Sequence, residues 1–284
     1  MTLDQLQSLK AIIETGSFRS AAVRVHRTQP AVTHQIKALE REMGHALIDR
    51  KTAAPTPAGA LFYAQARKLL TDADALRAAM RDFDETASSE LRLGTSDTTA
   101  LYILPKIVQR FRRQQPKAKL HIVNRPTEII ATLVERGDLD LGILTLPTVR
   151  AALEERMLFQ QELVLVVSKR HALSKRPVIR LRDLHGEPIL LLEEVTRTGR
   201  LLRDYFAERD FAPNVVLDTS SFEVIKRYVA EGIGISFLPK ETITPRDNKL
   251  AVLPFSGLPR VTIGAVWRKG AYQTRAAQAF LKLL

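Results

Sequence analysis

The chain of 284 residues contains no cysteine, and this excludes several kinds of site. Without a thiol there can be no disulfide framework, no thiolate metal site and no cysteine nucleophile. No histidine stands at a zinc-binding spacing from another ligand. The sequence patterns of zinc proteases, P-loops and serine hydrolases are also missing. We therefore expect no metal, no cofactor and no enzymatic activity.

Long apolar runs are absent as well. No uninterrupted segment is long enough to cross a bilayer. The first residues, MTLDQLQSLKAII, lack the basic stretch and apolar run of a secretory signal. The apolar share of 45% is still ordinary for a chain that buries a core. These features favour a cytoplasmic protein with no membrane partner.

Charge of one sign is in excess. The formal net charge is +12, which suggests an anionic partner such as nucleic acid. Residues 1–60 carry eight Lys/Arg and five Asp/Glu, a net of only +3. Most of the excess therefore lies downstream, and charge alone does not locate a nucleic-acid site.

Three short helices are predicted in the first 57 residues. Gly16 separates an amphipathic helix from a second one, which Ser17 can cap by accepting a backbone N–H. Thr28 can cap a third helix, with Pro30 in its first turn, where the missing N–H costs nothing. Helix, short turn and capped helix form the pattern of a helix-turn-helix.

The third helix, TQPAVTHQIKALE, has a polar face opposite its apolar stripe. A recognition helix presents its N-terminal residues to base edges in the major groove, where Gln pairs with adenine and Lys reaches guanine or phosphate. A merely solvated face is the alternative, and this helix alone does not decide between them. The preceding helix, its tight turn and the helix that follows favour DNA. The outward-facing residues are Gln29, Thr33, His34 and Lys37.

Residues 58–88 are predicted to form one long helix. Apolar residues recur along it at heptad a and d spacing over three repeats. Such a seam packs either on its own domain or on a second copy of the chain. Its narrow width and polar flanks favour a homodimer. The seam consists of Phe62, Ala66, Leu69, Ala73, Leu76, Met80 and Phe83.

From about Glu90, strand-like and helical runs alternate, which predicts mostly parallel sheets in an α/β domain. Two lobes are expected, lobe I at 89–161 and 266–284 and lobe II at 162–265. The chain would cross between them near Gln161 and near residues 265–266. The last helix should pack on lobe I. A cleft between such lobes, at the carboxyl ends of strands, is where a small ligand binds.

Hydroxyl residues follow four of the predicted strands, where helices begin. Each is explained singly as a helix cap, but four such segments would converge on one cleft. Helix N-termini bind anions, and two arginines could pair with a carboxylate. We expect a small anionic metabolite. The predicted effector-binding residues are Ser96, Thr98, Thr99, Arg125, Thr127, Thr196, Arg197, Thr219 and Ser220.

Two other functional classes stay open. A solute-binding protein would have two such lobes, but an export signal is missing and the first 87 residues would be unexplained. A two-lobed enzyme would need a nucleophile and a base in the cleft, and none is assembled there. A DNA footprint would separate a regulator from both.

The stretch SFRSAAVRVHRTQPAVTHQIKALEREMG resembles the N-terminal helix-turn-helix of LysR-type transcriptional regulators. LIDR, PTPAG, LRLGTS, ERGDLDLGI and VAEGIGISFLP resemble later segments of that family, so the resemblance covers essentially the whole chain. It implies a winged helix-turn-helix at residues 1–57, a dimerising linker helix at 58–88, and an effector domain like a periplasmic binding protein at 89–284. It also implies a homotetramer that binds promoter DNA and is retuned by a small ligand.

Two departures from the family pattern concern DNA contacts. His34 stands where the family often has arginine, and the wing segment KTAAPTPA lacks a second arginine. The wing is therefore expected to contact the minor groove less, or only the backbone. With the resemblance, the predicted DNA-binding set also includes Ser17, Arg19, Thr28, Pro30, Arg50 and Lys51.

Overall fold

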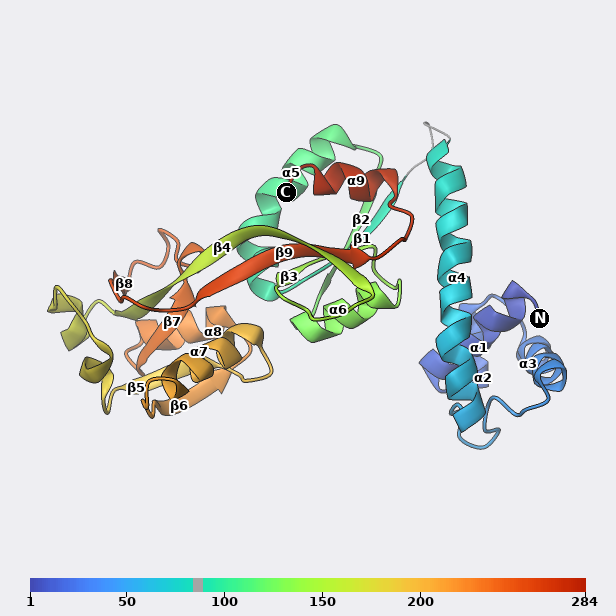
Figure 1. The fold of residues 1–284 in the computed structure, drawn as a ribbon, viewed down its shortest axis with the longest axis horizontal. Helices are drawn as coiled ribbons and strands as arrows, with labels where there is room; N and C mark the ends of the chain where they lie inside the picture. The colour runs from blue at the N-terminus through green and yellow to red at the C-terminus, as the bar shows by residue number, and fades with distance from the viewer. Residues whose placement is uncertain (84–88) are drawn as a thin grey trace. The chain divides into compact units, whose positions relative to one another are not determined.

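The structure, a computed structural model, consists of two compact units, Met1–Ala87 and Ser88–Leu284 (Figure 1). It describes residues 1–83 and 89–284. The last part of the predicted linker helix, residues 84–88, lies outside the described residues. The helices of the first unit are α1 (Leu3–Thr15), α2 (Phe18–Arg24), α3 (Gln29–Met43) and α4 (Pro57–Phe83).

Helices α1, α2 and α3 form the predicted helix-turn-helix around a small apolar core. Ala21 of α2 is fully buried, and its small side chain lets the neighbouring helices approach closely. The Ser17 hydroxyl caps α2 by accepting the Ser20 N–H at 3.3 Å. The Thr28 hydroxyl caps α3 by accepting the Ala31 N–H at 3.4 Å. Both helices therefore begin where their caps predict.

A short wing follows α3, and the carboxylate of Glu40 holds it at its base. Ile48 and Pro55 form the antiparallel bridge of the wing. Glu40 Oε1 accepts the N–H groups of Leu47 at 2.8 Å and Ile48 at 3.1 Å, while Oε2 pairs with the guanidinium of Arg50. Since backbone N–H groups need partners, this one side chain ties the wing to α3.

Helix α4 begins in close contact with the wing. A Cβ atom placed on Gly59 would lie 1.8 Å from the backbone oxygen of Leu47. Only glycine therefore allows this approach of α4, and the contact sets where the helix rests on the helix-turn-helix core.

The packing of α4 splits the predicted heptad seam. Phe62 and Ala66 contact the helix-turn-helix core together with Leu70, which the heptad pattern did not include. This corrects the expectation that the whole seam faces another copy, because the core of the same unit covers its start. Ala73 is half-buried. The later seam residues are exposed, by 49% at Leu69, 66% at Leu76, 63% at Met80 and 86% at Phe83.

The first lobe of the second unit has parallel strands in the order β2-β1-β3, followed by β9 and the first half of β4, which are antiparallel. Helix α6 covers one face of this sheet, and α5 and α9 cover the other (Figure 1). As predicted, the last helix packs here, with the Phe280 ring 5.3 Å from that of Phe111. The elements are β1 (Glu90–Thr95), a π-helical turn η1 (Thr99–Ile103), α5 (Leu104–Gln114), β2 (Lys119–Asn124), α6 (Thr127–Glu135), β3 (Leu141–Thr145) and α9 (Arg275–Leu281).

The second lobe is built from β7, β5 and β6, with β8 and the second half of β4. Leu163 and Leu165 of β4 pack in the cluster under α7, while Val164 and Val166 pack under α8. This alternation places one helix on each face of the sheet. The elements are β5 (Pro188–Leu192), α7 (Arg197–Ala207), β6 (Asn214–Thr219), α8 (Phe222–Ala230), β7 (Ile235–Pro239) and β8 (Leu250–Leu253), with 3₁₀ turns η2 (Ala172–Lys175), η3 (Leu181–Leu184) and η4 (Lys240–Thr242).

Two long strands, β4 (Leu153–Ser168) and β9 (Arg260–Arg268), run side by side between the lobes (Figure 1). β4 pairs with β9 as far as Glu162 and with β7 from Leu163 onward, so the first crossing lies next to Gln161, as predicted. β9 already pairs with β4 at its first residue. The return crossing therefore lies before β9, not at residues 265–266, because all of β9 belongs to the sheet of the first lobe.

Replacing Gly59 by Ala tests the contact between α4 and the wing. Helix propensity alone would make this change stabilising by about 1 kcal/mol. We expect the opposite, a loss of about 1–3 kcal/mol, because the methyl group overlaps backbone that cannot move alone. Urea unfolding followed by far-UV circular dichroism measures the effect. The neighbouring Ala60→Gly, at an exposed site, controls for propensity, and a stabilised Gly59→Ala variant would contradict the contact.

Candidate functional site

A cavity of about 300 Å³ lies between the two lobes of the second unit. Seven of the nine predicted effector residues line it, which brings all four predicted segments together. Thr99 and Thr219 do not line it. The Thr99 hydroxyl accepts a hydrogen bond from that of Ser96 at 3.3 Å, and the Thr219 hydroxyl accepts the Ser221 N–H at 3.4 Å. Both hydroxyls therefore have local partners, and a role of either in binding stays a prediction. The seven are Ser96, Thr98, Arg125, Thr127, Thr196, Arg197 and Ser220.

Two helices begin at the cavity wall, α6 at Thr127 and α7 at Arg197. The Thr196 hydroxyl accepts the Gly199 N–H at 3.0 Å and so acts as the cap of α7. Thr127 and Thr198 are each only 8% exposed. The first N–H groups of a helix have no partner within it. This wall therefore favours a ligand that accepts hydrogen bonds or carries negative charge.

Gln161 lines the cavity where β4 passes from one lobe to the other. Its side chain is almost fully buried, at 2% exposure, and its amide Nε2 has no hydrogen-bond partner among the described residues. Such an unpaired donor costs about 1–3 kcal/mol. Gln161 was not predicted as a binding residue, although a polar residue at the lobe crossing of an apolar strand is a usable signal.

Asp97 and Arg125 lie on the first-lobe side of the cavity. The Asn124 amide donates to the Asp97 carboxylate, and the Arg125 guanidinium donates to the Asn124 carbonyl at 2.7 Å. The negative charge of Asp97 therefore already has a hydrogen-bond donor. Further lining residues that were not predicted are Asn124, Pro126, Thr145, Leu192, Thr198, Phe222, Pro239 and Ile263.

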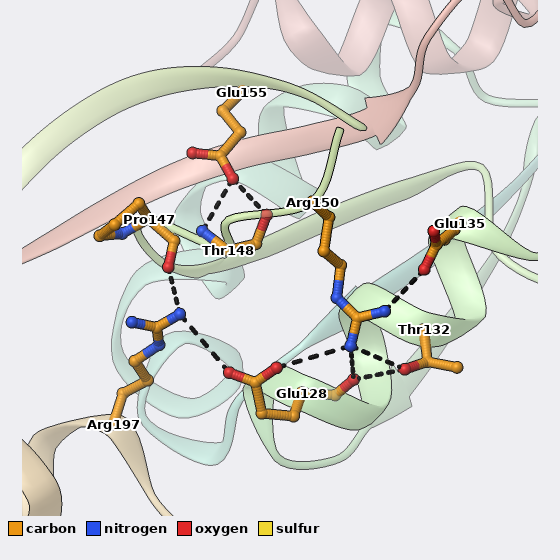
Figure 2. A network of polar contacts seen from close by, with 8 residues as sticks. All are labelled: Glu128, Thr132, Glu135, Pro147, Thr148, Arg150, Glu155 and Arg197. Carbon is orange, nitrogen blue, oxygen red and sulfur yellow. Dashed lines mark hydrogen bonds and ion pairs between the residues drawn. The ribbon is translucent and has the colours of Figure 1, made fainter. Parts of the chain in front are cut away.

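Arg197 connects the lobes beside the cavity (Figure 2). It belongs to lobe II, and its Nη2 donates to the Pro147 carbonyl and lies 3.5 Å from Glu128 Oε1, both of lobe I. Glu128 Oε2 lies 3.5 Å from Arg150 Nη2, and Arg150 Nη1 lies 2.6 Å from Glu135 Oε2. The guanidinium proposed for a ligand thus has a protein carboxylate as neighbour, which the sequence did not indicate.

A second contact between the lobes involves a buried lysine. Lys226 of α8 is 5% exposed, and its ammonium lies 5.1 Å from the ring centre of Tyr102 in η1. It also donates to the Thr242 carbonyl at 2.9 Å and pairs with Asp247 at 3.2 Å. Burial would raise the pKa of Asp247, but hydrogen bonds from Thr244 and Lys226 outweigh it and lower that pKa. The buried cation is therefore well satisfied.

In the first unit, the outward face of α3 presents most of the predicted recognition residues. Gln29, Pro30, His34 and Lys37 are exposed, while the opposite apolar stripe is fully buried. Thr33 is half-buried, and its hydroxyl donates to the Gln29 carbonyl at 2.9 Å. Of the remaining predicted residues on the helix-turn-helix, Ser17 is half-buried and Arg19 and Thr28 are exposed.

The two wing cations have different surroundings. Arg50 pairs with Glu40 and lies 5.3 Å over the Phe18 ring, so its guanidinium is engaged within the unit. A DNA contact of Arg50 stays a prediction, and it would have to share this guanidinium with Glu40. Lys51 is exposed at the tip, where the N–H groups of Thr52 and Lys51 lower the pKa of Asp49.

Over residues 1–83 and 89–284, no three His, Asp or Glu side chains are grouped as a metal site would require. In the same residues, none of the helices is both long and apolar enough to span a bilayer.

Two family models match the chain. The model for bacterial regulatory helix-turn-helix proteins of the lysR family matches residues 3–60, and the model for the LysR substrate binding domain matches residues 84–284. Between the two matched ranges lie residues 61–83, which belong to α4 of the first unit.

Individual relatives agree with these models. The hydrogen peroxide-inducible genes activator of Escherichia coli O157:H7 is 32% identical over 280 residues, covering 95% of this chain and 90% of that protein. A probable RuBisCO transcriptional regulator of Gracilaria tenuistipitata var. liui is 28% identical over 293 residues, covering 99% and 94%. A single-residue variant of full-length OxyR from Pseudomonas aeruginosa superposes with a TM-score of 0.80 at 26% identity, covering 100% and 94%. The chain therefore belongs to the LysR family of DNA-binding transcriptional regulators, with a substrate-binding domain and no enzymatic role.

Proposed function

We propose that this LysR-family chain is a sequence-specific regulator whose promoter binding changes when a small anionic metabolite occupies the cavity between the lobes. The observation that carries the ligand part is Gln161, a buried amide whose Nε2 lacks a partner at the cavity wall. A ligand acceptor would remove the cost of that unpaired donor. Because a promoter regulator acts on the chromosome, its place of action is the cytoplasm.

The other polar groups of the cavity support the same ligand chemistry. The Nε atom of Arg197 is also buried without a partner among the described residues. Two helix starts add backbone donors. The Asp97 carboxylate, the one acidic group among the lining residues, already accepts a hydrogen bond from Asn124. Donors are therefore in surplus, and a carboxylate-sized anion would use them. The volume suits a small molecule.

On the DNA side, α3 is proposed as the recognition helix. Gln29 and His34 would face base edges and Lys37 the bases or phosphates, because these side chains are exposed near the helix N-terminus. Lys51 would contact the backbone from the wing. Arg50 would act through the wing instead, since its charge is already shared with Glu40.

Dimerisation is proposed through the later part of α4. Leu69, Leu76, Met80 and Phe83 are large apolar side chains that remain exposed in a single copy. Exposed apolar side chains aligned on one helix are typical of a helix that packs on a second helix. A homotetramer built from such dimers would bring several recognition helices to one promoter. Ligand occupancy would shift the balance between two lobe arrangements and so the spacing of these helices.

One relative is named for a response to hydrogen peroxide. This chain cannot sense peroxide through a thiol. These 284 residues contain no cysteine, so no sulfenic acid or disulfide can form in them. The proposed signal is therefore a bound molecule and not an oxidised cysteine.

Two substitutions on α3 separate base readout from phosphate attraction. Gln29→Ala should lose about 1–3 kcal/mol on the preferred sequence and little on other sequences. Lys37→Ala, if it contacts phosphate, should reduce the slope of log K against log salt by about 0.9. Preferred sequences are first selected from a random duplex pool, and affinity is measured by fluorescence anisotropy at several salt concentrations. A Gln29→Ala variant that binds every duplex like the wild type would exclude α3 as the reader.

Replacing Gln161 by Met tests the cavity. Removing the unpaired amide should stabilise the ligand-free second unit by about 1–3 kcal/mol and weaken the binding of small carboxylates. Fluorescence of Trp267 reports this unit selectively, because it is the only tryptophan of the chain. Gln160→Met, at the exposed neighbouring position, is the matched control and should change neither quantity. A destabilised Gln161→Met variant with unchanged ligand binding would count against the proposed site.

Hydrogen peroxide tests the absence of thiol sensing. We expect treatment of the purified chain to leave its affinity for a preferred duplex within about twofold, because no cysteine can be oxidised. Anisotropy before and after treatment measures this, with the Escherichia coli relative treated in parallel. A rapid change in this chain that a thiol reductant reverses would contradict the proposal.

A further inference from the structure

The network around Arg197 joins α7 of lobe II to α6 and the Pro147 loop of lobe I (Figure 2). The hydrogen bond and the ion pair of the Arg197 guanidinium both go through Nη2, which donates to the Pro147 carbonyl and faces Glu128 Oε1 at 3.5 Å. The Nε atom is buried and has no partner among these residues. Lobe I therefore holds the guanidinium through Nη2, and the side chain also lines the cavity.

Glu128 is itself fixed from the other side. Its Oε2 lies 3.5 Å from Arg150 Nη2, and Arg150 also donates to the Thr132 hydroxyl at 3.0 Å and pairs with Glu135 at 2.6 Å (Figure 2). The Arg150 side chain is only 24% exposed. Contacts of a charged group on two sides restrict its rotamers, so Glu128 offers its second oxygen to Arg197 in a defined direction.

We propose that Glu128 and the Pro147 carbonyl are positioning groups that aim Arg197 at the ligand, with Arg150 holding Glu128. This rests on the proposed function of the cavity as an anion site. Since Arg197 comes from lobe II and its positioning groups from lobe I, a bound anion would be gripped only when both lobes are in place. Specificity for an anion would then depend on Glu128, a residue with the same charge as the ligand.

The direction in which Glu128→Gln changes anion affinity distinguishes a positioning role from a simple effect of charge. Glu128→Gln removes a negative charge near the cavity, so electrostatics alone predicts tighter anion binding. Positioning predicts weaker binding, because Gln is neutral and holds the guanidinium less firmly. We expect about tenfold weaker binding for Glu128→Gln and a smaller loss for Arg150→Gln. Asp97→Asn is the matched control, since it removes a cavity carboxylate that does not contact Arg197, and it should tighten anion binding.

The probes are succinate, benzoate and inorganic phosphate, each titrated into the full chain and followed by Trp267 fluorescence and calorimetry. Arg197→Gln should lose the binding of the tightest probe, and Arg197→Lys should recover only part of it. If Glu128→Gln binds that probe as tightly as wild type while Arg197→Gln loses it, the positioning role is wrong and the site remains. If neither Arg197→Gln nor Gln161→Met changes binding, the proposed cavity function is wrong.

A measurement without ligand tests the pair itself. In a double-mutant cycle, Glu128→Gln and Arg197→Gln should have non-additive effects on the unfolding of the second unit, followed by Trp267 fluorescence. Additive effects would overturn the positioning role, whether or not a probe binds. If none of the three probes binds the wild-type chain, that result counts against the anion site.

Discussion

Strand β4 belongs to two sheets, and the second unit depends on this. Up to Glu162 it pairs with β9 in the sheet of the first lobe, and from Leu163 it pairs with β7 in that of the second. The second half of the strand is almost entirely buried, so a shift of its register would expose the core of the second lobe. The change of partner therefore lies between Glu162 and Leu163, next to the buried Gln161.

The position of the cavity follows from the same arrangement. Parallel strands β2 and β5 end toward the space between the lobes, and the helices that follow place Thr127 and Thr198 on its wall. Neither lobe has a complete site, because the donors come from both. Arg197 and Lys226 add polar contacts across the cleft, one to a carboxylate and a carbonyl, the other to an aromatic ring. Ligand binding and lobe arrangement are thus physically linked.

The first unit uses charge more for its own structure than the sequence suggests. Both carboxylate oxygens of Glu40 accept hydrogen bonds from the wing, one from two backbone N–H groups and the other from Arg50. The guanidinium of Arg50 is thus paired within the unit, while Lys37 and Arg41 of the third helix and Lys51 of the wing are exposed cations. With fewer cations available for phosphates, hydrogen bonds from neutral side chains to bases would contribute a larger share of the DNA contacts.

Local chemistry in the sequence was enough to determine the element types, the caps at Ser17 and Thr28, the two α/β lobes and four of the segments that meet at the cavity. These features depend on periodicity and on hydrogen bonds within a few residues, which a sequence displays directly. Tertiary structure alone decided the rest. The start of the α4 seam is buried on its own unit, Thr99 and Thr219 do not line the cavity, and Arg50 pairs with Glu40. Glu128 matters because folding brings Arg197 next to it. Gln161 matters because folding buries its amide without a partner among the described residues. Such contacts join residues far apart along the chain, so no local pattern encodes them.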